Sequence, residues 1–124
     1  MLFRSDLAKV RGPFDVSELA NVAAVASLDD VAERDRRRDV NQAERERLVA
    51  ALDVRGITVY PAAANFVCIE VGDGFALAQL LEREGVIVRP LVAFGAPSCV
   101  RVTVGLPEQD DAFLAALDRC LQPA

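Results

Sequence analysis

The sequence predicts an α+β fold, a two-layer small domain in which a mainly antiparallel sheet of three to four strands packs on helices, preceded by two N-terminal helices. The first observation is size, because 124 residues with 52% hydrophobic content suffice for one domain with a core. The second is a set of short β-type runs from residue 57 onward, bounded by glycine and proline turns. The third is helical periodicity before and between these runs, which gives the order helix-helix-β-β-α-β-β-α.

The first two predicted elements are helices. Residues 16–28, VSELANVAAVASL, are apolar and too long for a typical strand, so we expect a mostly buried helix with Asp15 as its cap. Residues 30–54 are dense in charge and become apolar only from Leu48. Glutamates interleave there with arginines at i,i+4 spacing, which predicts a long helix with a solvated face.

Four short runs are predicted strands: residues 57–60, 65–71, 86–89 and 99–104. Side chains of the second and fourth runs alternate between two faces. The apolar face is formed by Val67, Ile69, Val71, Val100, Val102 and Val104. The opposite face is formed by Phe66, Cys68, Glu70, Cys99, Arg101 and Thr103. We expect the helices to cover the apolar face.

Two further helices are predicted after these strands. The first follows the turn Gly72-Asp73-Gly74 and runs to about Glu84, with Asp73 as a candidate cap, and the second begins near Pro107. Their apolar stripes are Leu77, Leu80 and Leu81, and Phe113, Leu117 and Leu121. We expect residues 1–29 to form an N-terminal loop and the Ala-rich helix, and residues 30–124 to form the small domain.

Composition excludes several classes of function. The chain has no histidine, which excludes Ser-His triads and His-ligated metal sites. A net charge of −5 and the absence of tryptophan disfavour nucleic-acid binding. Three cysteines match no metal or redox motif, and an odd count fits a reducing cytoplasm. Without a long apolar run, we expect neither a signal peptide nor a membrane partner.

Arg89 and Arg101 are the best candidates for a binding site. They lie on the third and fourth β-type runs, and Gly95 stands midway between them in sequence. If the runs fold back about Gly95, the two guanidiniums face each other, and opposed like charges destabilise a sheet. Arginine binds carboxylate or phosphate bidentately, so this placement predicts an anion between them. The alternative is a pair of solvent-facing strand arginines without a ligand.

Other residues with chemical potential have simpler explanations. Asp29-Asp30 and Asp110-Asp111 stand at predicted helix starts, where capping explains them. Lys9 is the only lysine, and it lies in a polar stretch that does not resemble the desolvated site a Schiff-base lysine needs. We therefore predict no catalytic residue and no metal ligand in this chain.

Four segments resemble a known family. They are KVRGPFDVSELANVAA at residues 9–24, AANFVCIEV at 63–71, GVIVRP at 85–90 and VRVTVGLPEQDDAFLAAL at 100–117. Their order and spacing resemble the histidinol-phosphate aminotransferases, which are pyridoxal-phosphate-dependent enzymes of fold type I. The resemblance covers nearly the whole chain and corresponds to the last third of a full-length enzyme.

The resemblance implies roles for both arginines. Arg101 matches the arginine that holds the substrate carboxylate, and Arg89 matches one beside the distal anionic group, a phosphate in histidinol phosphate. The implied reaction is amino-group transfer between histidinol phosphate and 2-oxoglutarate in histidine biosynthesis. The family's cofactor lysine and ring-binding residues have no counterpart here. We therefore expect the chain alone to be inactive and not to hold pyridoxal phosphate stably.

The resemblance also bears on partners. In the family, the segment at residues 9–24 and the helix after it pack against the large domain and the partner subunit. We therefore expect a homo-oligomer, or association with a missing large domain, together with a small anionic substrate. The alternatives from other functional classes are a non-enzymatic small-molecule-binding module and an assembly domain derived from an aminotransferase.

Overall fold

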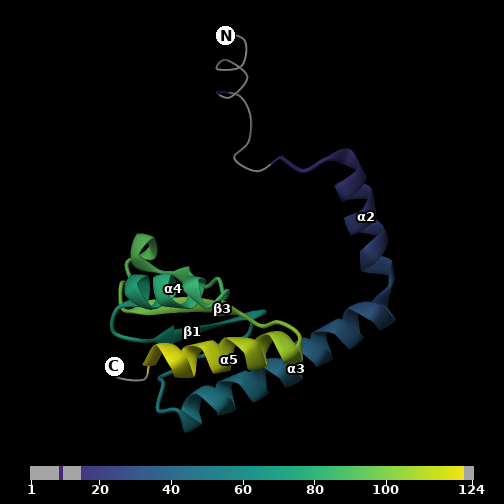
Figure 1. Ribbon diagram of the computed structural model, residues 1–124. Helices are drawn as coiled ribbons and strands as arrows, with labels where there is room; N and C mark the ends of the chain where they lie inside the picture. Colours follow the sequence, from purple (N-terminus) through teal and green to yellow (C-terminus); the bar gives the residue numbers. More distant parts are fainter. Residues whose placement is uncertain (1–8, 10–14, 122–124) are drawn as a thin grey trace. The chain divides into compact units, whose positions relative to one another are not determined.

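The computed structural model describes Lys9 and residues 15–121, and it confirms the predicted α+β class. The described elements run α2, α3, β1, α4, β2, η1, β3 and α5 (Figure 1). Contacts divide the chain into two compact units, Met1–Arg37 and Arg38–Ala124. The predicted boundary between residues 29 and 30 concerns functional parts and stays a prediction.

Helix α2 (Glu18–Asp29) forms where predicted but is not buried. Leu19 and Val25 are 79% and 66% exposed, and no residue of the helix is buried. Burial needs a covering surface, and its described neighbours supply none. The cap is Ser17 instead of Asp15: Ser17 Oγ accepts a hydrogen bond from the Ala20 amide at 3.2 Å, because Ser17 directly precedes the helix in extended conformation.

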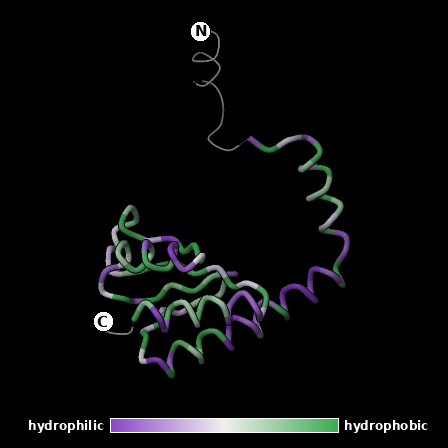
Figure 2. Tube along the Cα trace, in the orientation of Figure 1, coloured by the Kyte–Doolittle hydropathy of each residue, from purple (hydrophilic) through white to green (hydrophobic). Residues whose placement is uncertain are grey.

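Helix α3 (Val31–Val54) begins with Asp30 as its cap, as the paired acids predicted. Figure 2 shows hydrophobic colouring along much of α2 and hydrophilic colouring along the first turns of α3. Only Glu44, Leu48 and Leu52 of α3 are buried, at a spacing of four residues. Among the described residues, no helix is long and apolar enough to cross a membrane.

The sheet has three antiparallel strands in the order β1-β3-β2. Their bounds are Phe66–Glu70, Arg89–Pro90 and Cys99–Thr103 for β1, β2 and β3. The predicted strand at 57–60 reduces to one bridge, Val59 to Ile69, because Pro61 next to it has no amide to extend the ladder. The predicted strand at 86–89 pairs only from Arg89 onward.

The apolar face of the sheet carries the core, as predicted. Val67, Ile69 and Val100 are fully buried there, and Val102 is 4% exposed. Residues of α3, α4 and α5 pack on this face: Leu48, Leu52, Leu77, Leu81, Phe113, Leu114, Ala116 and Leu117. Leu80 and Leu121 were expected in the core but are 40% and 49% exposed, since each lies at the edge of its helix's apolar stripe.

Two helices, α4 (Gly74–Arg83) and α5 (Pro107–Leu121), complete the helical layer that packs on the apolar face of the sheet. Asp73 caps α4 as predicted, accepting from the Ala76 amide at 2.9 Å. The second half of α3 runs beside α5 (Figure 1). Arg55, the residue that follows α3, forms a bidentate pair with Asp118 of α5 at 2.7 and 2.8 Å. Arg119 joins α5 to Glu84 at the end of α4.

Candidate functional site

The structure brings Arg89 and Arg101 together. They are direct partners in the antiparallel pairing of β2 with β3, so both side chains leave the sheet on the same side. Gly95, midway between them, adopts the left-handed conformation with φ 80°, which closes the turn η1 (Val92–Phe94). The predicted folding back of this segment about Gly95 is therefore confirmed.

An aromatic ring lies against each guanidinium. Arg101 Cζ is 5.2 Å from the ring centroid of Phe66 on β1. Arg89 Cζ is 5.4 Å from the ring centroid of Phe94 in η1. Both distances fall within the range of a cation–π contact. The alternation on β1 placed Phe66 on this face, whereas Phe94 lies in a turn whose conformation no sequence periodicity predicts.

Arg101 is the less exposed of the two arginines, and part of its guanidinium lacks a partner. Its Nε is buried and finds no hydrogen-bond acceptor among the described residues. A guanidinium stays charged at any accessible pH and carries donors only. A buried donor without an acceptor is costly, and Arg101 Nε is one of two buried side-chain atoms without a partner in the described part of the chain.

The arginines line an open pocket of about 500 Å³. Its polar lining residues are Arg89, Arg101 and Thr103. Its other lining residues are Ile87, Val88, Pro90, Ala93 and Phe94. An apolar wall beside two cationic groups suits a small anion that carries an apolar body.

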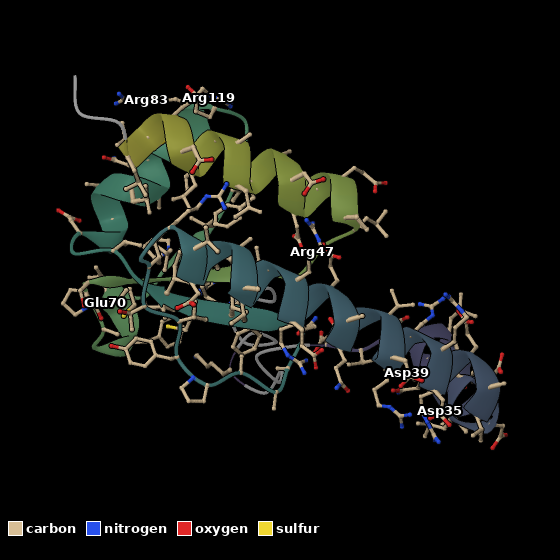
Figure 3. All side chains as sticks on the ribbon, turned by 90° about the horizontal axis from the view of Figure 1, so that it is seen from below. Asp35, Asp39, Arg47, Glu70, Arg83 and Arg119 are labelled. Atoms are coloured by element: carbon tan, nitrogen blue, oxygen red, sulfur yellow. The ribbon has the colours of Figure 1, made fainter. Side chains whose placement is uncertain are left out.

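The acid on the same face of the sheet is already engaged. Glu70 Oε2 accepts a hydrogen bond from Tyr60 Oη at 2.8 Å and one from Cys99 Sγ at 3.4 Å. Hydrogen bonds from Ser98, Tyr60 and Cys99 hold the pKa of Glu70 below its usual value. Figure 3 labels Glu70 on β1. Glu70 therefore stays ionised but is committed to these donors, and sequence reasoning did not single out this cluster.

The cysteines of this face are not reactive nucleophiles. Burial and the neighbouring Cys99 thiol raise the pKa of Cys68. Cys99 is only 4% exposed. The thiolate is the reactive form, so a raised pKa keeps Cys68 inert near neutral pH. Among the residues described, no group of three or more acidic or cysteine side chains is arranged to hold a metal ion.

Capping was predicted for all four paired acids and is confirmed for Asp30 and Asp110. Asp29 is instead the last residue of α2, because that helix runs up to the start of α3. Asp30 caps α3, and Asp110 Oδ1 accepts from the Gly105 amide at 3.0 Å. Asp111 instead forms an ion pair with Arg47 Nη1 at 2.7 Å. Arg47, labelled in Figure 3, extends from α3 toward α5 and also binds Glu44.

The pocket does not fit a whole pyridoxal-phosphate site. Such a site needs an amine to bind the aldehyde and an acid to pair with the pyridinium nitrogen. Neither a lysine nor a carboxylate is among the lining residues. Lys9, the chain's one lysine, belongs to the other unit. What the pocket offers is a pair of cations and an apolar wall.

Comparisons with known proteins agree with this architecture. The relatives include histidinol-phosphate aminotransferase 1 of Cupriavidus pinatubonensis, 42% identical over 120 residues, which cover 94% of this chain and 32% of that protein. Histidinol-phosphate aminotransferase of Roseiflexus castenholzii is 44% identical over 117 residues, or 90% of this chain and 32% of the relative. The chain spans about a third of the length of these curated relatives.

A solved structure and a family model also match this chain, and both indicate aminotransferases. A crystal structure from Burkholderia pseudomallei, described as a candidate aminotransferase, superposes with a TM-score of 0.76 at 27% identity. It matches 94% of this chain and 36% of the other chain. The model of the family named aminotransferase class I and II matches residues 3–117. The chain therefore belongs to the family of class I and II aminotransferases.

Proposed function

We propose that this chain is the substrate-anion-binding part of a pyridoxal-phosphate-dependent aminotransferase that acts on histidinol phosphate and 2-oxoglutarate. The observation that carries the proposal is the direct pairing of Arg89 with Arg101 over one pocket. 2-Oxoglutarate carries two carboxylates and histidinol phosphate carries a phosphate, and two guanidiniums on one face suit such anionic groups. The names of the relatives support histidinol phosphate as the amino donor.

The two arginines take different parts of the substrate in this proposal. Arg101 is half-buried and has an unpartnered Nε, so in 2-oxoglutarate, the substrate that has carboxylates, it holds the one nearest the reacting carbon. Arg89 is exposed at the rim and holds the distal carboxylate or phosphate. Fixing the two non-reacting ends would orient the carbon between them for proton transfer.

Titration calorimetry on the chain with glutamate, 2-oxoglutarate and histidinol phosphate tests this site. We expect Arg101→Ala to weaken binding by about tenfold or more, because a charge-assisted hydrogen bond is lost. The matched control is Arg83→Ala, an exposed arginine of α4 outside the pocket, which should bind as the parent does. Heat that survives Arg101→Ala would contradict the proposal.

The cofactor chemistry, by this proposal, is supplied by residues outside this chain, so the chain alone neither transaminates nor holds pyridoxal phosphate. The support is the lack of an amine or acid in the described pocket. When the chain is mixed with pyridoxal phosphate, we expect no stable Schiff-base absorbance. A stable band abolished by Lys9→Ala would show that Lys9 binds the cofactor after all.

The partner in this proposal is a second copy of the chain or the large domain of the enzyme, and it covers α2. The apolar side chains of α2 are exposed, with Val22 and Leu28 at 62% and 65%. Apolar surface of this kind marks an interface. Light scattering at micromolar concentration should give at least a dimer, and a monomeric mass would argue against a homo-oligomer.

The free cysteines 68, 99 and 120 fit a cytoplasmic setting.

A further inference from the structure

The two guanidiniums of the pocket are held close together although nothing in the described chain neutralises them. Arg89 and Arg101 are opposed across the β2–β3 ladder. Neither pairs with a carboxylate among the described residues, and Glu70 on the same face is bound by Tyr60 and Cys99. Opposed like charges repel and would turn both long side chains outward. The observed positions of the two side chains therefore need another favourable contact.

That interaction comes from two phenylalanines on different elements. Phe66 lies on β1 beside Arg101, and Phe94 lies in η1 beside Arg89, at 5.2 and 5.4 Å. The negative face of an aromatic ring attracts a guanidinium and also removes water from one side of it. Each ring thus favours one position of its cation before any ligand arrives.

We propose that Phe66 and Phe94 are positioning residues that hold the arginine pair ready for its anion. Phe94 has a second role, because it lines the pocket while Phe66 does not. Phe94 therefore also contacts the apolar body of the ligand, and Phe66 acts only through Arg101. This inference rests on the anion site proposed above.

The asymmetry gives the two rings separable effects. Phe66→Leu keeps an apolar side chain of similar size but removes the ring, so it should weaken inorganic phosphate and phenyl phosphate equally, by about two- to fivefold. Phe94→Leu should weaken phenyl phosphate more than inorganic phosphate, because the ligand ring loses its contact as well. Phe66→Tyr, which keeps the ring, should restore parent affinity.

The experiment is a calorimetric titration of the full chain with inorganic phosphate and with phenyl phosphate. The variants are Phe66→Leu, Phe66→Tyr, Phe94→Leu, Arg101→Ala and the control Phe75→Leu. Phe75 is 54% exposed on α4 and lies outside the arginine pocket, so its variant should bind as the parent does. Far-ultraviolet circular dichroism establishes that each variant is folded.

The outcomes distinguish the positioning role of the phenylalanines from the anion site of the arginines. If Arg101→Ala abolishes phosphate binding while Phe66→Leu binds as the parent does, the anion site stands and the positioning role of Phe66 is refuted. If Arg101→Ala has no effect, or if the parent chain binds neither ligand at tens of millimolar, both fail. If Phe66→Leu is unfolded, the Nε–H resonance of Arg101 in the folded Phe66→Tyr and parent chains decides. The inference is supported if the chemical shift of this proton is displaced by the aromatic ring in both chains and changes when phosphate is added. A chemical shift that the ring does not displace overturns the inference.

Discussion

Tyr60 is the chain's one tyrosine, and its hydroxyl donates a hydrogen bond to Glu70. When the phenol ionises, the Glu70 carboxylate loses this hydrogen bond. The negative charge of the carboxylate also repels the phenolate. The bond and the charge together raise the pKa of Tyr60 from 10.0 to about 12. With no tryptophan in the chain, the ultraviolet absorbance of Tyr60 can be followed without overlap from indole.

A spectrophotometric titration of Tyr60 should therefore show ionisation near pH 12 in the folded chain. Glu70→Gln removes the charge and should return the pKa toward 10, the ordinary value for tyrosine. The same titration in denaturant gives the unfolded reference. A folded parent chain, established by circular dichroism, that ionises at the ordinary pKa would contradict the bond between Tyr60 and Glu70.

Asp110 is a second residue whose protonation the fold changes. It is 2% exposed, and its Oδ2 has no donor within reach in the described part of the chain. Burial, and then the hydrogen bond and charge of Glu44, raise the pKa of Asp110, although the Gly105 amide and Arg47 oppose the shift. Asp111, Glu44 and Arg47 are the charged neighbours. We expect that, when Asp110 is protonated, its proton lies on Oδ2 and faces the Glu44 carboxylate.

The raised pKa of Asp110 makes the stability of the chain depend on pH in a definite direction. The pKa of Asp110 in the folded chain lies above its ordinary value of 3.8. Between these two pKa values the folded chain binds more protons than the unfolded chain, so the free energy of unfolding falls as the pH rises through this interval. Asp110→Asn carries the donor permanently, so its urea midpoint should exceed the parent's at pH 8. The difference should shrink toward pH 4. A variant that is less stable than the parent at pH 8 would be evidence against a shared proton.

At the scale of elements, α4 is fixed to the sheet by a close approach at its first residue. Gly74 is buried, and its amide donates to the Pro97 carbonyl at 3.0 Å. A methyl group added at Gly74 would overlap the Cys99 carbonyl oxygen and lie 3.1 Å from that of Pro97. Both are backbone atoms, so the helix start would have to move.

Gly74→Ala should therefore lower the free energy of unfolding by about 1–3 kcal/mol, the usual range for overpacking. Urea denaturation followed by Tyr60 fluorescence measures this loss. Gly105→Ala is the comparison, because its added methyl meets the flexible side chain of Gln109 first, at 2.8 and 3.0 Å. We expect a smaller loss there. Equal losses in the two variants would show that backbone contact is not the cause.

The elements also show what the sequence alone can predict. Alternation placed Val67 and Val100 in the core. The pairing of Arg89 with Arg101 was predicted on the condition that the chain folds back about Gly95, and the structure meets this condition. The burial of α2 was predicted wrongly, because an apolar helix is buried only where another surface meets it. Phe94 was missed because its position depends on a single turn, η1, and not on a periodic pattern.

At the scale of the whole molecule, all core residues belong to the unit that begins at Arg38. The residues of the other unit that the structure describes, Lys9 and residues 15–37, contribute no buried residue to the core. A chain limited to residues 38–124 should therefore unfold cooperatively, with a free energy within about 1 kcal/mol of the full chain. Chemical denaturation of both chains measures this. A non-cooperative transition would show that residues before 38 support the core.

The turn at Gly95 places both arginines of the pocket on a single short hairpin. Both cations come from one hairpin, with eleven residues between their positions, 89 and 101. Closing so short a loop costs little chain entropy, and a hairpin forms within microseconds. The separation of the two charges therefore depends on the local geometry of the hairpin, and we expect it to form early in folding. A protein can then change its far surfaces over evolution while the same two charges remain at the same separation.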